Sequence, residues 1–253
     1  MKKEIIIVTG AYGAETIQRL GGQDALLPIV AAAGADGVEI RRELFNRQQL
    51  DSLPQLAQAI TQQRLFAVYS APEALFTPTQ QLNPNLPALL AEAQQLQARQ
   101  LKLSLGHYPP GFDFTALKVA LEHHPVKLVV ENDQTADGGN LSRLNAFFHA
   151  AEENGLPVSM TFDMANWHWV EQDAFAAADR LARHVSYVHV KAATHGARGW
   201  RAIALDDTDG SWRTLLARLP QAAPCGIEFP LQGEDLVAVT RHYVNLLRAE
   251  SPR

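Results

Sequence analysis

The chain has 253 residues, of which 47% are hydrophobic and 19% charged, so a disordered protein and a chain too small to bury a core are excluded. A formal net charge of −5 argues against nucleic acid as a partner, because proteins that bind it usually carry a basic face. No stretch approaches the roughly 18 apolar residues of a membrane helix, and no signal peptide is recognisable, so we expect a cytoplasmic protein without a membrane partner.

Short β-rich runs alternate with longer helical patterns along the whole chain. The runs predict eight strands, each followed by a helical stretch, at residues 4–9, 37–40, 65–70, 101–105, 127–131, 158–163, 185–190 and 226–229. The stretch after the fifth strand illustrates the helical pattern, with Asn140 as a candidate N-cap. Apolar residues then recur at helical spacing: Leu141, Leu144, Phe147, Phe148 and Ala151.

Strict alternation of strands and helices predicts a parallel sheet covered by helices. Eight units leave about 32 residues each, which suits a closed barrel. We therefore predict the α/β class, as a single (β/α)8 TIM barrel that forms one domain over residues 1–253. The alternative, an open doubly wound sheet, usually carries a G-x-G-x-x-G turn after the first strand. The turn from Thr9 to Ala14 lacks that spacing, so no dinucleotide site is expected.

Polar side chains stand at the ends of four otherwise apolar strands. Glu131 ends the fifth, Asp163 ends the sixth, and His189 and Glu228 lie near the ends of the seventh and eighth. Such ends meet at one face of a (β/α)8 barrel. Three carboxylates in one cavity would repel each other, and a divalent cation would relieve that repulsion. The four residues therefore predict a metal site, whose oxygen-rich donor set with one imidazole favours Mn2+, Mg2+ or Co2+.

Each of these residues also has an ordinary structural explanation. Glu131 or Glu228 could cap the helix that follows it, and Asp163 could be an N-cap. His189 could be a hydrogen-bonded core histidine. Four such coincidences on consecutive strands would have to occur together, so the metal site is the simpler interpretation.

The segments around these residues read VVEND, TFDMANWHW, YVHVKAA and GIEFPL, with VEIRREL on the second strand. In order and spacing they resemble the strand ends of the xylose isomerase-like TIM-barrel superfamily of sugar isomerases, sugar epimerases and endonuclease IV-like enzymes. Within it, the chain most resembles epimerases associated with 2-ketogluconate utilisation. The resemblance implies one divalent ion, Mn2+ first and Mg2+, Co2+ or Zn2+ as alternatives, and implies that Glu131 and Glu228 are catalytic and move protons.

Two positions depart from the family pattern. The family usually has Asp-x-x-His on the sixth strand, but Asn166 stands at the histidine position and a histidine appears at His168 instead. The family often has an aspartate soon after the seventh-strand His-x-Lys, where this chain has Ala192. These departures bear on the substrate more than on the metal.

Further polar residues near the strand ends are predicted to contact the substrate. Lys191 alternates with His189 and should share its side of the strand. Residues 195–201 concentrate positive charge, so Arg198 would suit a carboxylate or phosphate, unless this loop is simply solvated. The predicted substrate-binding set is Glu39, His107, Asn166, His168, Lys191 and Arg198. Arg41 and Tyr69 are weaker candidates, and three tryptophans could form an apolar wall or simply pack: Trp167, Trp169 and Trp200.

The sequence thus predicts a metal-dependent isomerase or epimerase of a sugar or sugar acid, with or without a phosphate, which works through an enediolate. A lyase or dehydratase would share every motif. A nuclease of the endonuclease IV type would need more histidines, and Tyr69 stands where one might be expected. A non-catalytic sugar-binding protein would have no need of all four ligand types. Whether the chain forms a homo-oligomer is left open.

Overall fold

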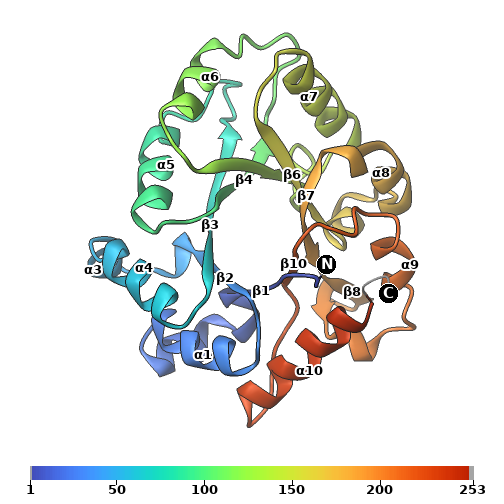
Figure 1. The fold of residues 1–253 in the computed structure, drawn as a ribbon. Coiled ribbons are helices and arrows are strands. Elements are labelled where there is room, and N and C mark those ends of the chain that lie inside the picture. Colours follow the sequence, from blue (N-terminus) through green and yellow to red (C-terminus); the bar gives the residue numbers. More distant parts are fainter. Residues whose placement is uncertain (1, 251–253) are drawn as a thin grey trace.

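The computed structural model describes residues 2–250 and contains a closed barrel of parallel strands surrounded by helices (Figure 1). Within these residues, the barrel strands are β1 (Ile5–Val8), β2 (Gly37–Arg41), β3 (Phe66–Phe76), β4 (Gln100–Gly106), β5 (Lys127–Glu131), β6 (Val158–Asp163), β7 (Val185–Val190) and β10 (Cys225–Ile227). They correspond one by one to the eight predicted strands. The (β/α)8 barrel is confirmed, and the open doubly wound sheet is wrong.

Helices follow the strands and cover the outside of the barrel. They are α1 (Ala14–Leu20), α2 (Leu27–Ala32), α3 (Arg47–Leu50), α4 (Leu53–Gln62), α5 (Leu86–Gln95), α6 (Thr115–Glu122), α7 (Leu141–Glu153), α8 (Ala174–Leu181), α9 (Trp212–Leu216) and α10 (Leu236–Ala249). The N-cap of α7 is Asn140, whose side chain accepts from the Arg143 N–H at 3.0 Å, and the predicted apolar stripe of this helix is buried. Among the described residues, no helix combines the length and apolarity that crossing a bilayer requires.

The interior of the barrel contains an apolar region and a polar region. A small apolar cluster of Ile6, Val68 and Tyr187 fills part of the interior, with Phe66 packed against it. Buried polar and charged side chains, among them Glu39 and Lys102, occupy other interior positions. Tyr187 joins the two regions because its ring packs in the apolar cluster while its hydroxyl donates to Glu39 at 2.7 Å.

The segment after β7, which the sequence analysis treats as a loop, has regular structure. It forms an antiparallel hairpin of β8 (Ala192–Gly196) and β9 (Gly199–Ile203) outside the barrel. Gly196 and Gly199 flank its two-residue turn, and Gly199 has a φ of 89°, a conformation that glycine adopts without strain. Gly196 and Gly199 are the sequence signal for this hairpin, because each flanks its turn.

Candidate active site

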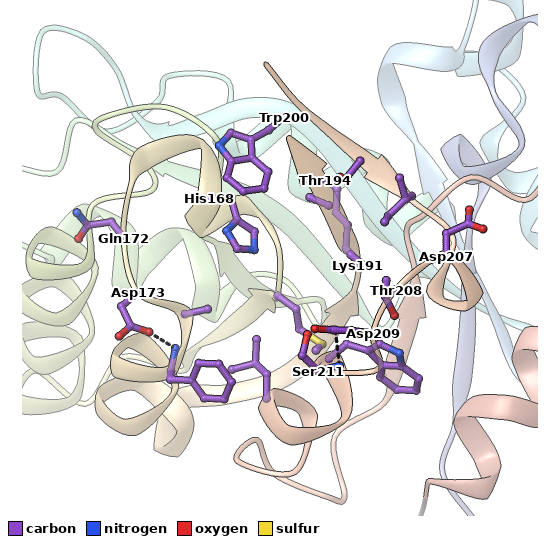
Figure 2. A pocket seen from close by; sticks show the side chains of 18 residues that line it. His168, Gln172, Asp173, Lys191, Thr194, Trp200, Asp207, Thr208, Asp209 and Ser211 are labelled. Atoms are coloured by element: carbon purple, nitrogen blue, oxygen red, sulfur yellow. Dashed lines mark hydrogen bonds between the residues drawn. The ribbon is translucent and has the colours of Figure 1, made fainter. Parts of the chain in front are cut away.

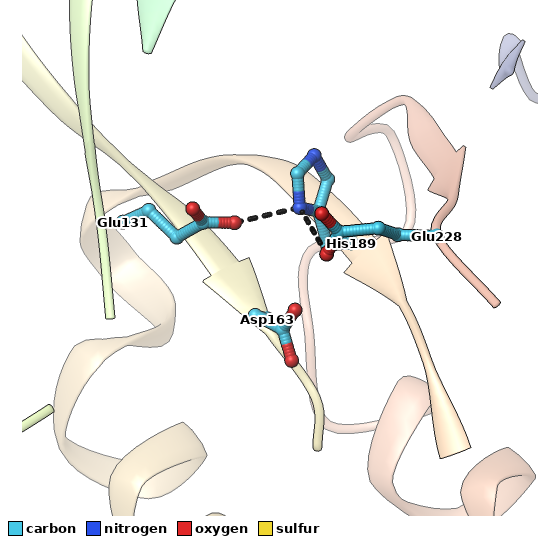
Figure 3. A group of neighbouring side chains, drawn as sticks. All are labelled: Glu131, Asp163, His189 and Glu228. Carbon is cyan, nitrogen blue, oxygen red and sulfur yellow. Dashed lines mark ion pairs between the residues drawn. The ribbon is translucent and has the colours of Figure 1, made fainter. Parts of the chain in front are cut away.

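Four predicted ligands come together at the carboxyl ends of neighbouring strands (Figure 3). Glu131 and Asp163 end β5 and β6, His189 lies on β7, and Glu228 directly follows β10. One donor atom from each residue lies within 4.8 Å of the donor atoms of the other three. A divalent ion with bonds of about 2.1 Å separates its donor atoms by roughly 3 to 4.2 Å. The four residues are therefore close enough together to be candidate ligands of one such ion.

Backbone pairing fixes these positions. The Glu228 N–H donates to the Val190 carbonyl at 3.2 Å, which extends the β10–β7 pairing by one residue. Asn132 links the ends of β5 and β6, because its side chain donates to the Asp163 carbonyl at 3.0 Å and accepts from the Asp163 N–H at 2.9 Å. The cluster is thus held by the strands and not by mobile loops.

The orientation of His189 is set from below by Glu39. The Nε2 atom of His189 lies 2.8 Å from Glu39 Oε2, and Tyr187 donates to the same oxygen at 2.7 Å. Burial alone would raise the pKa of Glu39, but His189 and Lys102 outweigh it and lower this pKa, so the carboxylate is charged. Glu39 therefore holds the proton on Nε2 and turns Nδ1 toward the cluster.

The atoms facing the cluster fit a cation. His189 Nδ1 lies 2.6 Å from Glu131 Oε1, yet neither atom has a hydrogen-bond partner of acceptable geometry. Burial would lower the pKa of His189, but Glu39, Glu228 and Glu131 raise it well above its ordinary value. The same negative field that favours a proton on Nδ1 favours a metal ion in its place.

Three buried or half-buried cations surround the carboxylates. Lys102 forms an ion pair with Glu131, and Arg41 Nη1 lies 2.7 Å from Glu228 Oε1. Lys191 Nζ lies 3.3 Å from Glu228 Oε2 and 3.4 Å from Asp163 Oδ2. Arg41 also contacts Glu43, which gives five carboxylates against three cations, a difference of two negative charges. The carboxylates of this count are Glu39, Glu43, Glu131, Asp163 and Glu228. If His189 is neutral, a divalent cation would balance these two excess negative charges.

The carboxylates differ in their affinity for protons. Burial would raise the pKa of Glu131, but Lys102 and His189 lower it to about 2. The pKa of Glu228 is likewise held well below its usual range by Lys191 and His189 against the effect of burial. Burial raises the pKa of Asp163 to about 7, against the opposing effect of Lys191. Both glutamates are therefore ionised, whereas Asp163 needs a further positive charge to stay so at neutral pH.

Three of the predicted substrate residues lie beside the cluster or open toward a neighbouring cavity. Lys191 contacts Asn166 Oδ1 at 3.2 Å as well as the two carboxylates. Asn166 also donates to the Asn132 carbonyl at 2.9 Å and is buried, so it fixes the lysine in place. His168 stacks on Trp200, with ring centroids 4.5 Å apart. Contact of these residues with a substrate stays a prediction.

The other three predicted substrate residues occupy different surroundings. Glu39 has no exposed surface and lies under His189, a position that fits the orientation of that ring better than contact with a substrate. His107 follows β4 and pairs with Asp137 at 3.2 Å. Arg198 lies in the exposed turn of the hairpin.

Sequence reasoning missed three residues that shape the site. Lys102 lies in the middle of β4, a mostly apolar strand. A charged residue inside such a strand is the sequence feature that could have identified it. Tyr187 alternates with His189 along β7 and so shares its side. Gly226 leaves space for both, because a Cβ there would lie 2.8 Å from Tyr187 Cζ and 3.0 Å from His189 Cδ2.

Two cavities open beside the cluster, and both are lined by Lys191. One, of about 410 Å³, is also lined by Glu228 and Arg41. The other, of about 500 Å³, lies between the β6–α8 connection, the hairpin and α9 (Figure 2). Lys191 therefore borders both cavities, and Glu228 is the cluster residue that lines the smaller one.

No family model and no curated protein sequence matches the chain, but solved structures do. The IolI protein with a bound zinc atom superposes with a TM-score of 0.73 at 11% identity, covering 100% of this chain and 99% of that one. The probable 3-DHS dehydratase AsbF of Bacillus anthracis gives 0.68 at 11% identity, covering 96% and 98%. An L-ribulose 3-epimerase gives 0.66 at 16% identity, covering 99% and 94%. The predicted resemblance to the sugar isomerase and epimerase barrels is confirmed at the level of the fold.

Proposed function

We propose that the protein is a metal-dependent sugar isomerase or epimerase that transfers a proton next to a carbonyl group. The observation that carries the proposal is the placement of Glu131 and Glu228 on either side of His189, with Asp163 between them (Figure 3). Fold similarity to an L-ribulose 3-epimerase supports a sugar as the substrate.

The metal would be held by Glu131, Asp163, His189 and Glu228. The charge imbalance and the unpartnered Nδ1 and Oε1 atoms fit a divalent ion. Three carboxylates and one imidazole favour Mn2+, while the zinc in the IolI structure keeps Zn2+ as an alternative. When bound, such an ion polarises a carbonyl oxygen and stabilises an enediolate.

The two glutamates are positioned for the proton transfers. One oxygen of Glu131 is fixed by Lys102, and one oxygen of Glu228 is fixed by Arg41, so the second oxygen of each faces the cluster. One glutamate would remove the carbon-bound proton, and the other would return a proton from the opposite side. Return to the same carbon gives an epimer, and return to the neighbouring carbon gives the aldose–ketose isomer. Lys191 would donate to a substrate oxygen.

Solvent exchange tests this proposal. The protein is incubated in D2O with Mn2+ and a panel of ketoses, and loss of the α-proton signal is followed by NMR. Glu131→Gln and Glu228→Gln are expected to abolish the exchange, whereas Glu234→Gln, at an exposed position, should exchange normally. The metal content of each variant separates lost proton transfer from lost metal. Undiminished exchange in both site variants would overturn the proposal.

A lyase or dehydratase is the second candidate, because the fold similarity to AsbF is as extensive as that to the epimerase. It would also begin with removal of an α-proton but would then expel water. Formation of an unsaturated product in the same NMR experiment would favour the dehydratase, and formation of an epimer or isomer would exclude it.

A further inference from the structure

The larger cavity beside the cluster has the position of a second subsite. Its volume is about 500 Å³, within the roughly 300–1,000 Å³ of small-molecule sites. Lys191 forms part of its wall, and the ammonium group of that lysine lies 3.4 Å from Asp163 Oδ2. Through Lys191, this cavity therefore adjoins the cluster.

One wall of the cavity is an aromatic platform. Trp200 on β9 stacks with His168, at 4.5 Å between centroids and 21° between planes. Figure 2 shows this pair on one side and Asp209 and Ser211 on the other. The wall also includes Trp212. A flat ring with an apolar face and hydroxyl edges matches such an aromatic surface.

The charges around the cavity disfavour an anion. Lys191 is already paired with Asp163 and Glu228, and partial burial lowers the pKa of His168, which favours its neutral form. The cavity is lined by three further carboxylates: Asp173, Asp207 and Asp209. A phosphate would meet repulsion there, whereas sugar hydroxyls donate well to carboxylates. Arg198, which suggested an acidic substrate, does not line this cavity.

We propose that this cavity binds a second, neutral sugar ring, so that the substrate is a glycoside of a ketose and not a free or phosphorylated monosaccharide. The smaller cavity, of about 410 Å³ beside Glu228, then receives the reacting ketose unit. The inference rests on the proposed function for the reacting unit, but the binding of the second ring depends on Trp200 and its neighbours alone.

Calorimetric titration of the Mn2+-loaded protein tests the proposal. The probes are three ketose disaccharides of different linkage, maltulose, lactulose and isomaltulose, compared with D-fructose and D-fructose 6-phosphate. At least one disaccharide is expected to bind about tenfold more tightly than D-fructose. Trp200→Ala should bring that ratio close to one without changing the affinity for D-fructose, and Trp200→Phe should retain most of it. Trp200→Leu keeps the apolar bulk and serves as a second variant without an aromatic face.

The outcomes separate this inference from the proposed function. If D-fructose exchanges its proton but no disaccharide binds more tightly, or the Trp200 variants lose both ligands equally, the subsite is wrong. Tightest binding of D-fructose 6-phosphate would also overturn it. If a disaccharide binds through Trp200 but no ketose exchanges, the subsite stands and the isomerase proposal fails.

Discussion

The cluster of candidate metal ligands and the larger cavity lie side by side, but they are built from different parts of the chain. The cluster residues stand at the ends of barrel strands and are buried or nearly so. The cavity is lined by connections, the hairpin and the short helix α9, with exposed carboxylates among its residues. The proposed chemistry thus belongs to the strands and the proposed selection of the substrate to the connections, a division that (β/α)8 barrels allow.

Removal of the metal should have the largest effect and should act on the cluster alone. Chelation with EDTA is expected to reduce solvent exchange to background, and one equivalent of Mn2+ should restore it, because the cluster is proposed to hold one ion. Bound metal should also raise the melting temperature in proportion to ln[Mn2+] above the dissociation constant. Full exchange by chelated protein with less than a tenth of an equivalent of metal would contradict this.

Lys102 tests whether the cluster depends on its internal ion pairs. Lys102→Met removes a buried cation and leaves Glu131 and Glu39 without it, so unfolding of the metal-free protein should cost about 3–5 kcal/mol less. Urea denaturation measures the change, and Mn2+ should reduce it by supplying positive charge. Lys118→Met, at an exposed position of α6, is the control and should shift stability by no more than about 0.5 kcal/mol. Equal stability of the two variants would argue against the role of Lys102.

Substitution of Glu39 tests whether this residue orients His189 within the cluster. Glu39→Gln replaces the charged partner of His189 Nε2, and metal affinity measured by calorimetry should fall about 10–100-fold. Tyr187→Phe removes one donor to Glu39 but keeps the histidine contact, so its effect should be smaller. If Glu39→Gln bound Mn2+ normally but bound D-fructose weakly, Glu39 would be a substrate contact, as first predicted from the sequence.

Substitution of one glycine in the barrel and one in the hairpin compares the two regions directly. Gly226→Ala places a Cβ 3.0 Å from His189 Cδ2 and should destabilise the protein by about 1–3 kcal/mol while it weakens metal binding. Gly196→Ala, in the hairpin, meets no atom within 4 Å and should leave both properties unchanged. Thermal melting and metal titration of both variants measure the contrast. Similar losses in the two variants would show that strands and hairpin are not independent.

The sequence was sufficient to predict the cluster because strand ends follow from local patterns. Glu131 and Asp163 interrupt apolar runs at their last residue, and the order of parallel strands then brings them together. Lys102 lies deeper in its strand, and its partner Glu131 becomes apparent only when β4 and β5 pair. The depth of Glu39 below the cluster could not be predicted for a related reason, since it depends on the stagger of the strands around the barrel.

The cavity could not have been predicted in the same way. His168 and Trp200 are separated along the chain by α8, β7 and β8, and they stack only because the hairpin folds back over the β6–α8 connection. The sequence gives the residue types but not that contact. The sequence therefore does not decide whether the tryptophans form an apolar wall or simply pack. Contact between Trp200 and a ligand stays a proposal.

The hairpin is connected to the barrel through two ends that lie next to each other. Ala192 pairs with Ile203, so the chain leaves and returns at neighbouring points, just beyond Lys191. Residues 193–202 could be lengthened, shortened or exchanged while β7 and α9 keep their places. Evolution or a protein engineer could then change which molecules are accepted without touching the strand ends, and one barrel could give rise to a series of enzymes that share a reaction and differ in substrate.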